Sequence, residues 1–230
     1  MFTISTQALT VGAITDAAAL EHNYSLQDTD LIELRLDALG AGEEVIDFAR
    51  RHSPALPLLI TARAPEEGGL GQHDLTSRLH LLRSLLPFAS LIDIETANHE
   101  LYQDLLEEAA AREVATVFSY HDFEEFDHLE TIETLARAQA LGATIAKAAV
   151  TVRDPLELTL FESLLAEMEG VPFSLMGMGK YGPASRLLAA QHGSVLNYGY
   201  LGAQATAPGQ WPAPLLKQVL GATPPFANYP

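Results

Sequence analysis

Residues 115–150 read ATVFSYHDFEEFDHLETIETLARAQALGATIAKAAV, and this stretch contains the pattern that decides the fold. Two apolar runs, Ala115–Tyr120 and Thr144–Val150, flank the segment Leu129–Leu141, whose apolar residues recur at helical spacing. A strand, a helix and a second strand in this order are typical of a parallel strand pair joined by a crossover helix. The stretch therefore predicts one βα unit and the strand that follows it.

The same alternation extends along the whole chain. The predicted strands are Leu9–Ile14, Leu31–Leu36, Pro57–Ala62, Ser90–Glu95, Ala115–Tyr120, Thr144–Val150, Phe173–Met176 and Val195–Tyr198. The predicted helices are Thr15–His22, Ala41–Arg51, His73–Leu86, Asn98–Ala111, Leu129–Leu141, Pro155–Glu169, Pro183–His192 and Pro212–Leu220.

Eight units of about 29 residues each, with no linker between them, favour one α/β domain. We expect a single (β/α)8 TIM barrel that serves as the catalytic domain over residues 1–230. An open doubly wound sheet is the alternative, because closure of a barrel is not encoded in local periodicity.

Composition excludes several classes of protein. Hydrophobic residues make up 48% of the chain, enough for a sizeable core, yet no apolar run reaches 18 residues, so we expect no membrane span. No basic side chain precedes Arg35, which is unlike a signal peptide. Zero cysteines exclude disulfides and fit the reducing cytoplasm. A net charge of −17 argues against nucleic acid as a partner.

The negative charge is unevenly placed. No Asp or Glu follows Glu169, so the last quarter of the chain carries +3 from Lys180, Arg186 and Lys217, against −20 for residues 1–169. A negative protein that binds a negative small molecule needs a region without carboxylates. We interpret the C-terminal quarter as that region, although an Ala-, Gly- and Pro-rich composition could exclude acids by chance.

Lys147 is the candidate nucleophile. It lies within the apolar run 143–151, whereas the other two lysines, Lys180 and Lys217, fall in a predicted loop and in the last helix. Burial penalises the ammonium form and lowers a lysine pKa, and a neutral amine can attack a carbonyl to form a Schiff base. The alternative is a lysine on an edge strand whose stem is buried and whose charged end reaches water.

Ionisable residues end five consecutive predicted strands. These residues are Glu33, Arg35 and Asp37 on the second strand, Arg63 with Glu66 and Glu67 after the third, Asp93 and Glu95 on the fourth, His121 on the fifth and Lys147 on the sixth. In the second strand the charges alternate with Leu and share one face, which predicts a charged barrel interior. Enzymes of this architecture place their chemistry at the C-terminal ends of the strands.

His121 is the best candidate for proton transfer among the eight histidines. It directly ends an apolar strand one unit before Lys147, so the two residues should be neighbours, and an imidazole titrates near neutral pH. Glu67, two strands back, could orient its ring. His99 is the competitor, although Ala-Asn-His-Glu at 97–100 looks like a helix start.

The segment Gly177-Met-Gly-Lys-Tyr-Gly182 matches G-x-G-x-x-G but lacks the later acid that a dinucleotide-binding motif needs for the ribose. We therefore expect it to provide a mobile loop or a close approach to an anion. No His-Glu-x-x-His motif and no cysteine is present, so we expect no catalytic metal.

Several short blocks together resemble the type I 3-dehydroquinate dehydratase family. The blocks are Glu-Leu-Arg-Leu-Asp (33–37), Thr-x-Arg with Glu-Gly-Gly (61–69), Ser-Tyr-His-Asp-Phe (119–123), Ala-Lys-Ala-Ala (146–149), Met-Gly-Met-Gly with Ser-Arg (176–186) and Ala-Pro-Gly-Gln (207–210). Each block is weak alone, but their order and spacing are specific. The resemblance implies a (β/α)8 barrel that needs neither a metal nor an organic cofactor.

The resemblance also implies roles for individual residues. Lys147 would form the imine, His121 would be the general acid and base, and Glu67 would be the carboxylate beside the histidine. The implied substrate-binding residues are Glu33, Arg35, Arg63, Met176, Met178, Arg186, Tyr198, Thr206 and Gln210. Arg186 would clamp the substrate carboxylate, with Gln210 on a closing loop.

Two positions depart from the family pattern: Tyr198 stands where Phe is usual, and Thr206 where Ser is usual. The implied reaction converts 3-dehydroquinate to 3-dehydroshikimate in the shikimate pathway, for aromatic amino acid biosynthesis. A class I Schiff-base aldolase and a non-catalytic barrel that binds a small carboxylate are the alternatives. Family members are often dimers, so a homodimer is compatible with the resemblance.

Overall fold

Eight parallel strands lie in the sheet in the order in which they occur along the chain. The computed structural model describes residues 8–168, 172–223 and 225. The strands are β1 Leu9–Ile14, β2 Leu31–Arg35, β3 Leu58–Thr61, β4 Leu91–Glu95, β5 Ala115–Asp122, β6 Ile145–Thr151, β7 Phe173–Met178 and β8 Leu196–Tyr200. Every paired neighbour is parallel, and β1 pairs with both β2 and β8.

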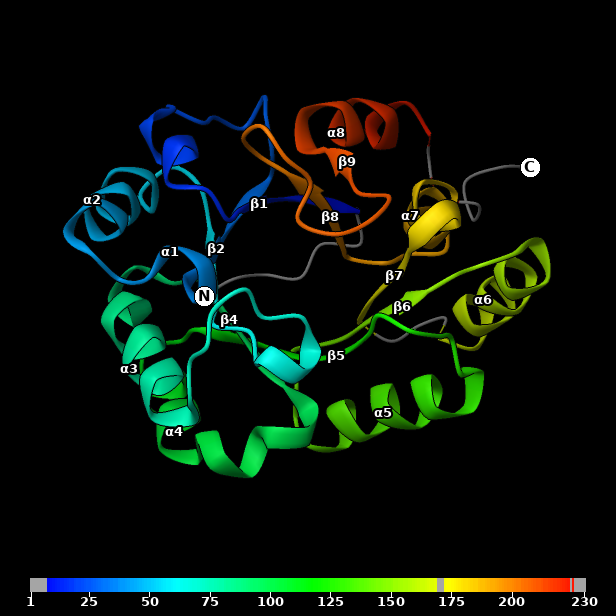
Figure 1. Cartoon of the computed structure of the whole chain (residues 1–230), viewed down its shortest axis with the longest axis horizontal. Coiled ribbons are helices and arrows are strands. Elements are labelled where there is room, and N and C mark those ends of the chain that lie inside the picture. Colours follow the sequence, from blue (N-terminus) through cyan, green and yellow to red (C-terminus); the bar gives the residue numbers. More distant parts are fainter. Residues whose placement is uncertain (1–7, 169–171, 224, 226–230) are drawn as a thin grey trace.

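The sheet closes where β7 meets β8. The Val195 amide donates to the Phe173 carbonyl oxygen at 2.9 Å, and the Ser174 hydroxyl donates to the Leu196 carbonyl oxygen at 2.6 Å. Figure 1 looks into the resulting ring, with strands around the centre and helices outside. The predicted (β/α)8 barrel is therefore confirmed, and the open sheet is not formed.

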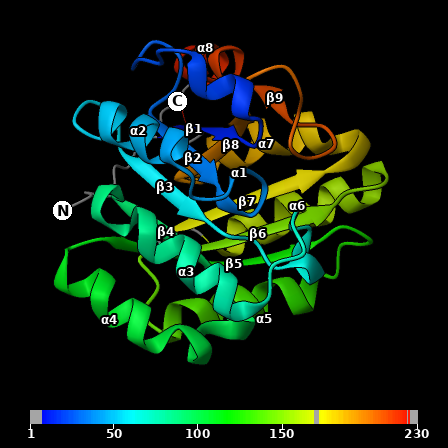
Figure 2. The same ribbon diagram turned by 60° about the vertical axis from the view of Figure 1, so that its left-hand side comes forward.

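The helices surround the strands (Figure 2). They are α1 Leu36–Leu39, α2 Glu43–His52, α3 Leu75–Leu85, α4 Gln103–Ala111, α5 His128–Ala140, α6 Pro155–Glu167, α7 Gly182–Gln191 and α8 Ala213–Ala222. Three begin at an aspartate whose carboxylate accepts backbone amides: Asp74 before α3, Asp127 before α5 and Asp154 before α6. These caps satisfy amides that would otherwise lack a partner in the first turn.

The structure differs from the expected elements in a few places. The first expected helix is only a 3₁₀ turn, Ala17–Glu21, because so short a segment gains too few hydrogen bonds to offset helix nucleation. The expected helix from Asn98 begins as a 3₁₀ turn, Thr96–Tyr102, and becomes helical at α4. A short strand, β9 Trp211–Pro212, adds to β8. Glu169, the expected end of α6, lies outside the described residues.

Side chains inside the barrel follow the two-residue period of the strands. At the N-terminal end the interior is an apolar layer that includes Leu31, Leu59, Leu91, Val117 and Ile145. Two residues further along the same strands come Glu33, Thr61, Asp93, Ser119 and Lys147, all buried. The interior therefore changes from apolar to polar toward the C-terminal ends of the strands, as the Leu–charge alternation predicts.

Within the described ranges, no helix is both long enough and apolar enough to cross a membrane.

Candidate active site

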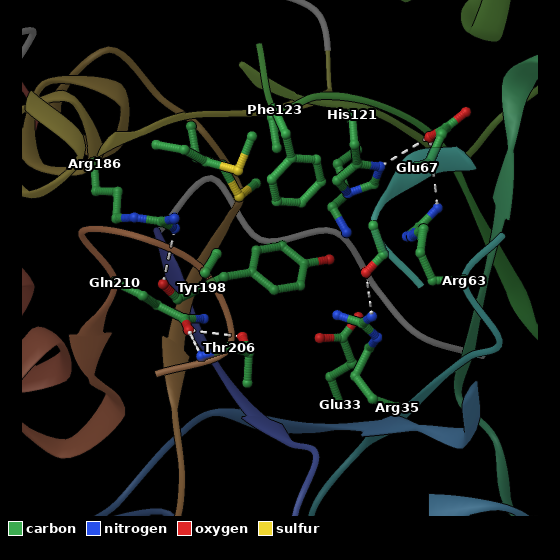
Figure 3. A pocket seen from close by; sticks show the side chains of 16 residues that line it. Glu33, Arg35, Arg63, Glu67, His121, Phe123, Arg186, Tyr198, Thr206 and Gln210 are labelled. Carbon is green, nitrogen blue, oxygen red and sulfur yellow. Dashed lines mark hydrogen bonds and ion pairs between the residues drawn. The ribbon is translucent and has the colours of Figure 1, made fainter. Parts of the chain in front are cut away.

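One pocket opens at the C-terminal ends of the strands and brings together the twelve residues to which the family resemblance assigned a role. The lining comprises Glu33, Arg35, Arg63, Glu67, His121, Lys147, Met176, Met178, Arg186, Tyr198, Thr206 and Gln210, with Gly68, Phe123, Ala149 and Ala207. Figure 3 shows how these side chains converge from all sides of the pocket. The first twelve come from the sequence prediction, and the last four were not predicted.

Lys147 lies on β6, lines the pocket and is almost fully buried, with 4% of its side chain exposed. Its Nζ donates to Asp93 Oδ2 at 2.8 Å and lies 4.2 Å from the centre of the Tyr198 ring. Burial lowers the pKa of Lys147 below its ordinary value of 10.5, and Arg63 adds to the effect, although Asp93 and Glu33 oppose it. The amine is thus more readily deprotonated than a surface lysine.

Asp93 is one of the strand-end residues that the sequence analysis named without a role. Its Oδ1 accepts from the Ser119 hydroxyl at 2.6 Å and from Arg63 Nη2 at 2.8 Å, while Oδ2 holds Lys147. Burial raises its pKa, but Arg63 and Lys147 outweigh that effect and hold the pKa of Asp93 below its ordinary value. The sequence signal for Asp93 was its position two residues after Leu91, which predicts that its side chain lies on the inner face of the strand.

His121 is the last residue but one of β5 and is oriented by Glu67. The His121 Nδ1 and Glu67 Oε2 atoms are 3.0 Å apart, which leaves Nε2 for other contacts. Burial lowers the pKa of His121 well below 6.5, and the charges of Arg63 and Lys147 lower it further. The imidazole is therefore neutral at pH 7, and a neutral imidazole can accept a proton.

Glu67 belongs to the 3₁₀ turn Pro65–Glu67, which follows β3. Burial raises its pKa to about 7, and the nearby carboxylates Glu95 and Asp93 contribute, against the charge of Arg63. Its neighbour Gly68 has φ of 83°, which only glycine adopts without strain, so this turn places Glu67 over the pocket. His99, the competitor for proton transfer, is buried in the turn before α4 and does not line the pocket.

Glu33 and Arg35 on β2 and Arg63 after β3 form the polar side of the pocket. Thr61 donates to Glu33 Oε1 at 2.8 Å, and Asp37 binds Arg35 through both carboxylate oxygens at 2.9 and 2.7 Å. Because Asp37 also accepts the backbone amide of Arg63, it fixes the start of the loop that carries Glu67. These contacts hold charged groups in place within a largely buried site.

Arg186 lies on the side of the pocket opposite Glu33, Arg35 and Arg63 (Figure 3). It is a buried residue of α7, and its Nη1 donates to the Tyr198 carbonyl oxygen at 3.0 Å. Within the described residues it forms no ion pair, so burial lowers its pKa to about 10, which still leaves it cationic at pH 7. A buried cation without a counter-charge is costly, and a ligand carboxylate would supply the missing charge.

The segment between β8 and β9 covers the pocket from the same side. The Gln210 side-chain oxygen accepts the Thr206 hydroxyl at 2.7 Å and the Thr206 amide at 2.8 Å, which leaves the Gln210 NH₂ group as a donor. The Gly179 amide donates to the Pro208 carbonyl oxygen at 3.1 Å. The glycine-rich segment 177–182 thus supports this covering segment by close backbone contact.

The described residues contain no group of three or more His, Cys, Asp or Glu side chains arranged to hold a metal ion. The arrangement instead offers an amine with a lowered pKa, a neutral imidazole and an unpaired guanidinium in one pocket. This set suits imine chemistry on a small carboxylate that also carries a carbonyl group.

Comparisons with known proteins agree with this geometry. A family model described as type I 3-dehydroquinase matches residues 8–223. The 3-dehydroquinate dehydratase of Methanothrix thermoacetophila is 32% identical over 208 residues, which cover 90% of this chain and 88% of the relative.

Two solved structures resemble the barrel. The 3-dehydroquinate dehydratase of Aquifex aeolicus matches with a TM-score of 0.79 and 27% identity, over 96% of this chain and 100% of that one. The enzyme from Geobacillus kaustophilus matches with a TM-score of 0.81 over 94% of this chain and 91% of that one, and its 24% identity supports the fold alone.

Proposed function

This chain belongs to the type I 3-dehydroquinase family, and we propose that it dehydrates 3-dehydroquinate to 3-dehydroshikimate through an imine on Lys147. The chain is accordingly a hydro-lyase of the shikimate pathway. The observation that carries the residue assignment is the placement of Lys147, buried and with a lowered pKa, in one pocket with His121 and the unpaired Arg186.

The first step is condensation of the neutral Lys147 amine with the C3 ketone, which releases water and forms an imine. The protonated imine withdraws electrons and acidifies the proton on C2. His121, neutral at pH 7 because of its lowered pKa, removes that proton and leaves an enamine.

In the second half of the reaction, His121 gives this proton to the leaving hydroxyl group. Electrons of the enamine expel the C1 hydroxyl group as His121 protonates it, so that water leaves and the C1–C2 double bond forms. Hydrolysis of the imine then consumes one water, releases 3-dehydroshikimate and regenerates Lys147. The net change is the loss of one water from the substrate.

The remaining residues would bind and orient the ring. Arg186 would pair with the substrate carboxylate, which would give this buried cation its counter-charge. The implied contacts to ring hydroxyls come from Glu33, Arg35 and Arg63, while Met176 and Met178 would line the wall beside the imine. Thr206 and Gln210 would cover the bound ring, with Gln210 assisting Arg186.

Membership of the family favours the dehydratase over the class I aldolase, which shares the barrel and the lysine. The non-catalytic alternative is disfavoured because the amine with a lowered pKa and the neutral imidazole occur together in the same pocket.

We further propose that the chain is one catalytic domain, because one family match spans residues 8–223. A homodimer is supported by the dimers common in the family. A chain with no cysteine is compatible with the reducing cytoplasm, which we propose as its location.

Borohydride trapping tests the covalent step. The protein incubated with 3-dehydroquinate and borohydride should lose activity and gain the mass of the reduced substrate on the peptide that contains Lys147. EDTA should not change turnover, which can be followed by the ultraviolet absorbance of the conjugated product.

Matched variants locate the adduct. Lys147→Ala should abolish both trapping and turnover, whereas Lys180→Ala, which alters a lysine outside the pocket lining, should retain both. An adduct on Lys180, or full activity in Lys147→Ala, would contradict the proposal.

A further inference from the structure

The hydroxyl group of Tyr198 is a buried donor without a partner. Only 4% of Tyr198 is exposed, and its Oη has no hydrogen-bond partner among the described residues. In Figure 3 the hydroxyl points into the pocket, toward the side that carries Glu33 and Arg35. A buried hydroxyl without a hydrogen bond is unfavourable, so the group is placed where a ligand atom could satisfy it.

Tyr198 has one contact to its ring and one to its backbone. Its face lies 4.2 Å from Lys147 Nζ, and its backbone carbonyl oxygen accepts from Arg186 Nη1. Tyr198 thus contacts the proposed nucleophile through its ring and the proposed carboxylate clamp through its backbone.

The hydroxyl is also a permanent donor. Burial raises the pKa of Tyr198 well above 10, and the negative charges of Glu33 and Asp93 raise it further. The phenol therefore stays protonated across the range in which Lys147 and His121 would work. A protonated phenol can donate a hydrogen bond to a substrate oxygen.

The proposed imine fixes which substrate oxygen is within reach. The carbon bonded to Lys147 is C3, and its two ring neighbours are C2 and C4. C1 carries the carboxylate that Arg186 would bind, and C4 lies across the ring from C1. In Figure 3 the Tyr198 hydroxyl points away from Arg186, so it is directed toward C4. C4 of 3-dehydroquinate carries a hydroxyl group.

We propose that Tyr198 is an additional specificity-determining residue, whose hydroxyl donates a hydrogen bond to the C4 hydroxyl of bound 3-dehydroquinate. This inference rests on the proposed function. The phenylalanine that is usual at this position in the family cannot form such a bond, so the contact would be a feature of this chain.

Tyr198→Phe tests the contact because it removes one oxygen atom and keeps the ring over Lys147. The hydrogen bond would form equally in the ground state and the transition state. We therefore expect KM for 3-dehydroquinate to rise about 3- to 10-fold, with kcat changing less than about twofold. On 3-dehydroquinate lacking the C4 hydroxyl, the variant and the parent should have the same KM.

Tyr102→Phe is the matched control. Tyr102 is another fully buried tyrosine whose hydroxyl has no partner among the described residues, but it packs in the outer core and does not line the pocket. Its loss should leave both KM and kcat unchanged, which separates a substrate contact from the general effect of removing a buried hydroxyl.

The outcomes separate this inference from the function on which it rests. If the parent turns over 3-dehydroquinate and Tyr198→Phe has the same KM as the parent, the inference is overturned but the proposed function stands. An equal rise in KM on both substrates, or a rise in Tyr102→Phe, would overturn the inference as well. No turnover of 3-dehydroquinate by the parent would overturn the proposed function and this inference together.

Discussion

At the scale of single residues, burial drives the three reactive groups of the pocket toward their neutral forms. It lowers the pKa of Lys147 and of His121, and it raises that of Glu67 to about 7. For the amine and the imidazole, the neutral form is the one that reacts as a nucleophile or a base. Burial in the same pocket therefore favours both imine formation by Lys147 and proton removal by His121.

His121→Ala should separate proton transfer from imine formation. Turnover should fall by roughly 10²–10⁴, the usual contribution of a positioned general acid or base, while borohydride still traps substrate on Lys147. In the parent, kcat/KM should fall as His121 becomes protonated. Because burial lowers its pKa well below 6.5, this acidic limb should lie below pH 6.5 and disappear in the variant.

His99→Ala is the control for that experiment, since His99 is also buried but lies outside the pocket lining. It should keep the parent pH profile. Loss of turnover in His99→Ala together with normal turnover in His121→Ala would transfer the role to His99.

At the scale of elements, the strands could be predicted to within a few residues because apolar residues predominate in each of them. The packing of the loops could not be predicted in this way. The period-two pattern places Glu33 and Lys147 on the inner face without knowledge of any partner. The segment between β8 and β9 is held by a close contact between Gly179 and Gly209. These glycines are thirty residues apart in the sequence and meet only in the folded chain.

Gly209→Ala should disturb the segment that carries Thr206 and Gln210. Gly209 has φ of 77°, and an added Cβ would collide with the Gly179 carbonyl oxygen. Strain of about 1–3 kcal/mol in this segment should weaken substrate binding, and we expect KM to rise roughly tenfold in steady-state assays.

Gly193→Ala is the matched control, because Gly193 also has positive φ, at 94°, but no atom lies within 4 Å of its added Cβ. It should lower the melting temperature with little change in KM. Equal KM values for Gly209→Ala and the parent would show that this segment does not contribute to binding.

At the scale of the whole molecule, the sequence predicts the number of βα units and the end of the barrel at which the active site lies. It does not predict that the sheet closes, or which buried charged side chains contact one another. Closure depends on hydrogen bonds from Val195 and Ser174, which no local pattern encodes. Asp93 and Lys147 are 54 residues apart in the sequence and form a hydrogen bond only because the barrel brings their strands together. The acid-free C-terminal quarter was informative, because it supplies Arg186 without a carboxylate beside it.

The charge network also links activity to the stability of the whole barrel, and Glu67→Gln tests that link. The folded pKa of Glu67 is about 7, whereas its ordinary value is 4.5. Between these values the folded state binds more protons than the unfolded state, so stability falls as pH rises from about 4.5 to 7 and stays lower above that range. Glutamine removes this penalty, which is on the order of 1–3 kcal/mol.

Calorimetry at pH 8 should therefore show a melting temperature several degrees higher for Glu67→Gln than for the parent, and a smaller difference at pH 5. Turnover should fall, because the amide cannot orient His121 as the carboxylate does. Glu66→Gln, which changes the exposed neighbour in the same way, should leave both properties unchanged. A loss of stability at pH 8 would show that Arg63 compensates the ionised carboxylate of Glu67. A gain equal at both pH values would show that the effect does not come from removing the ionised form.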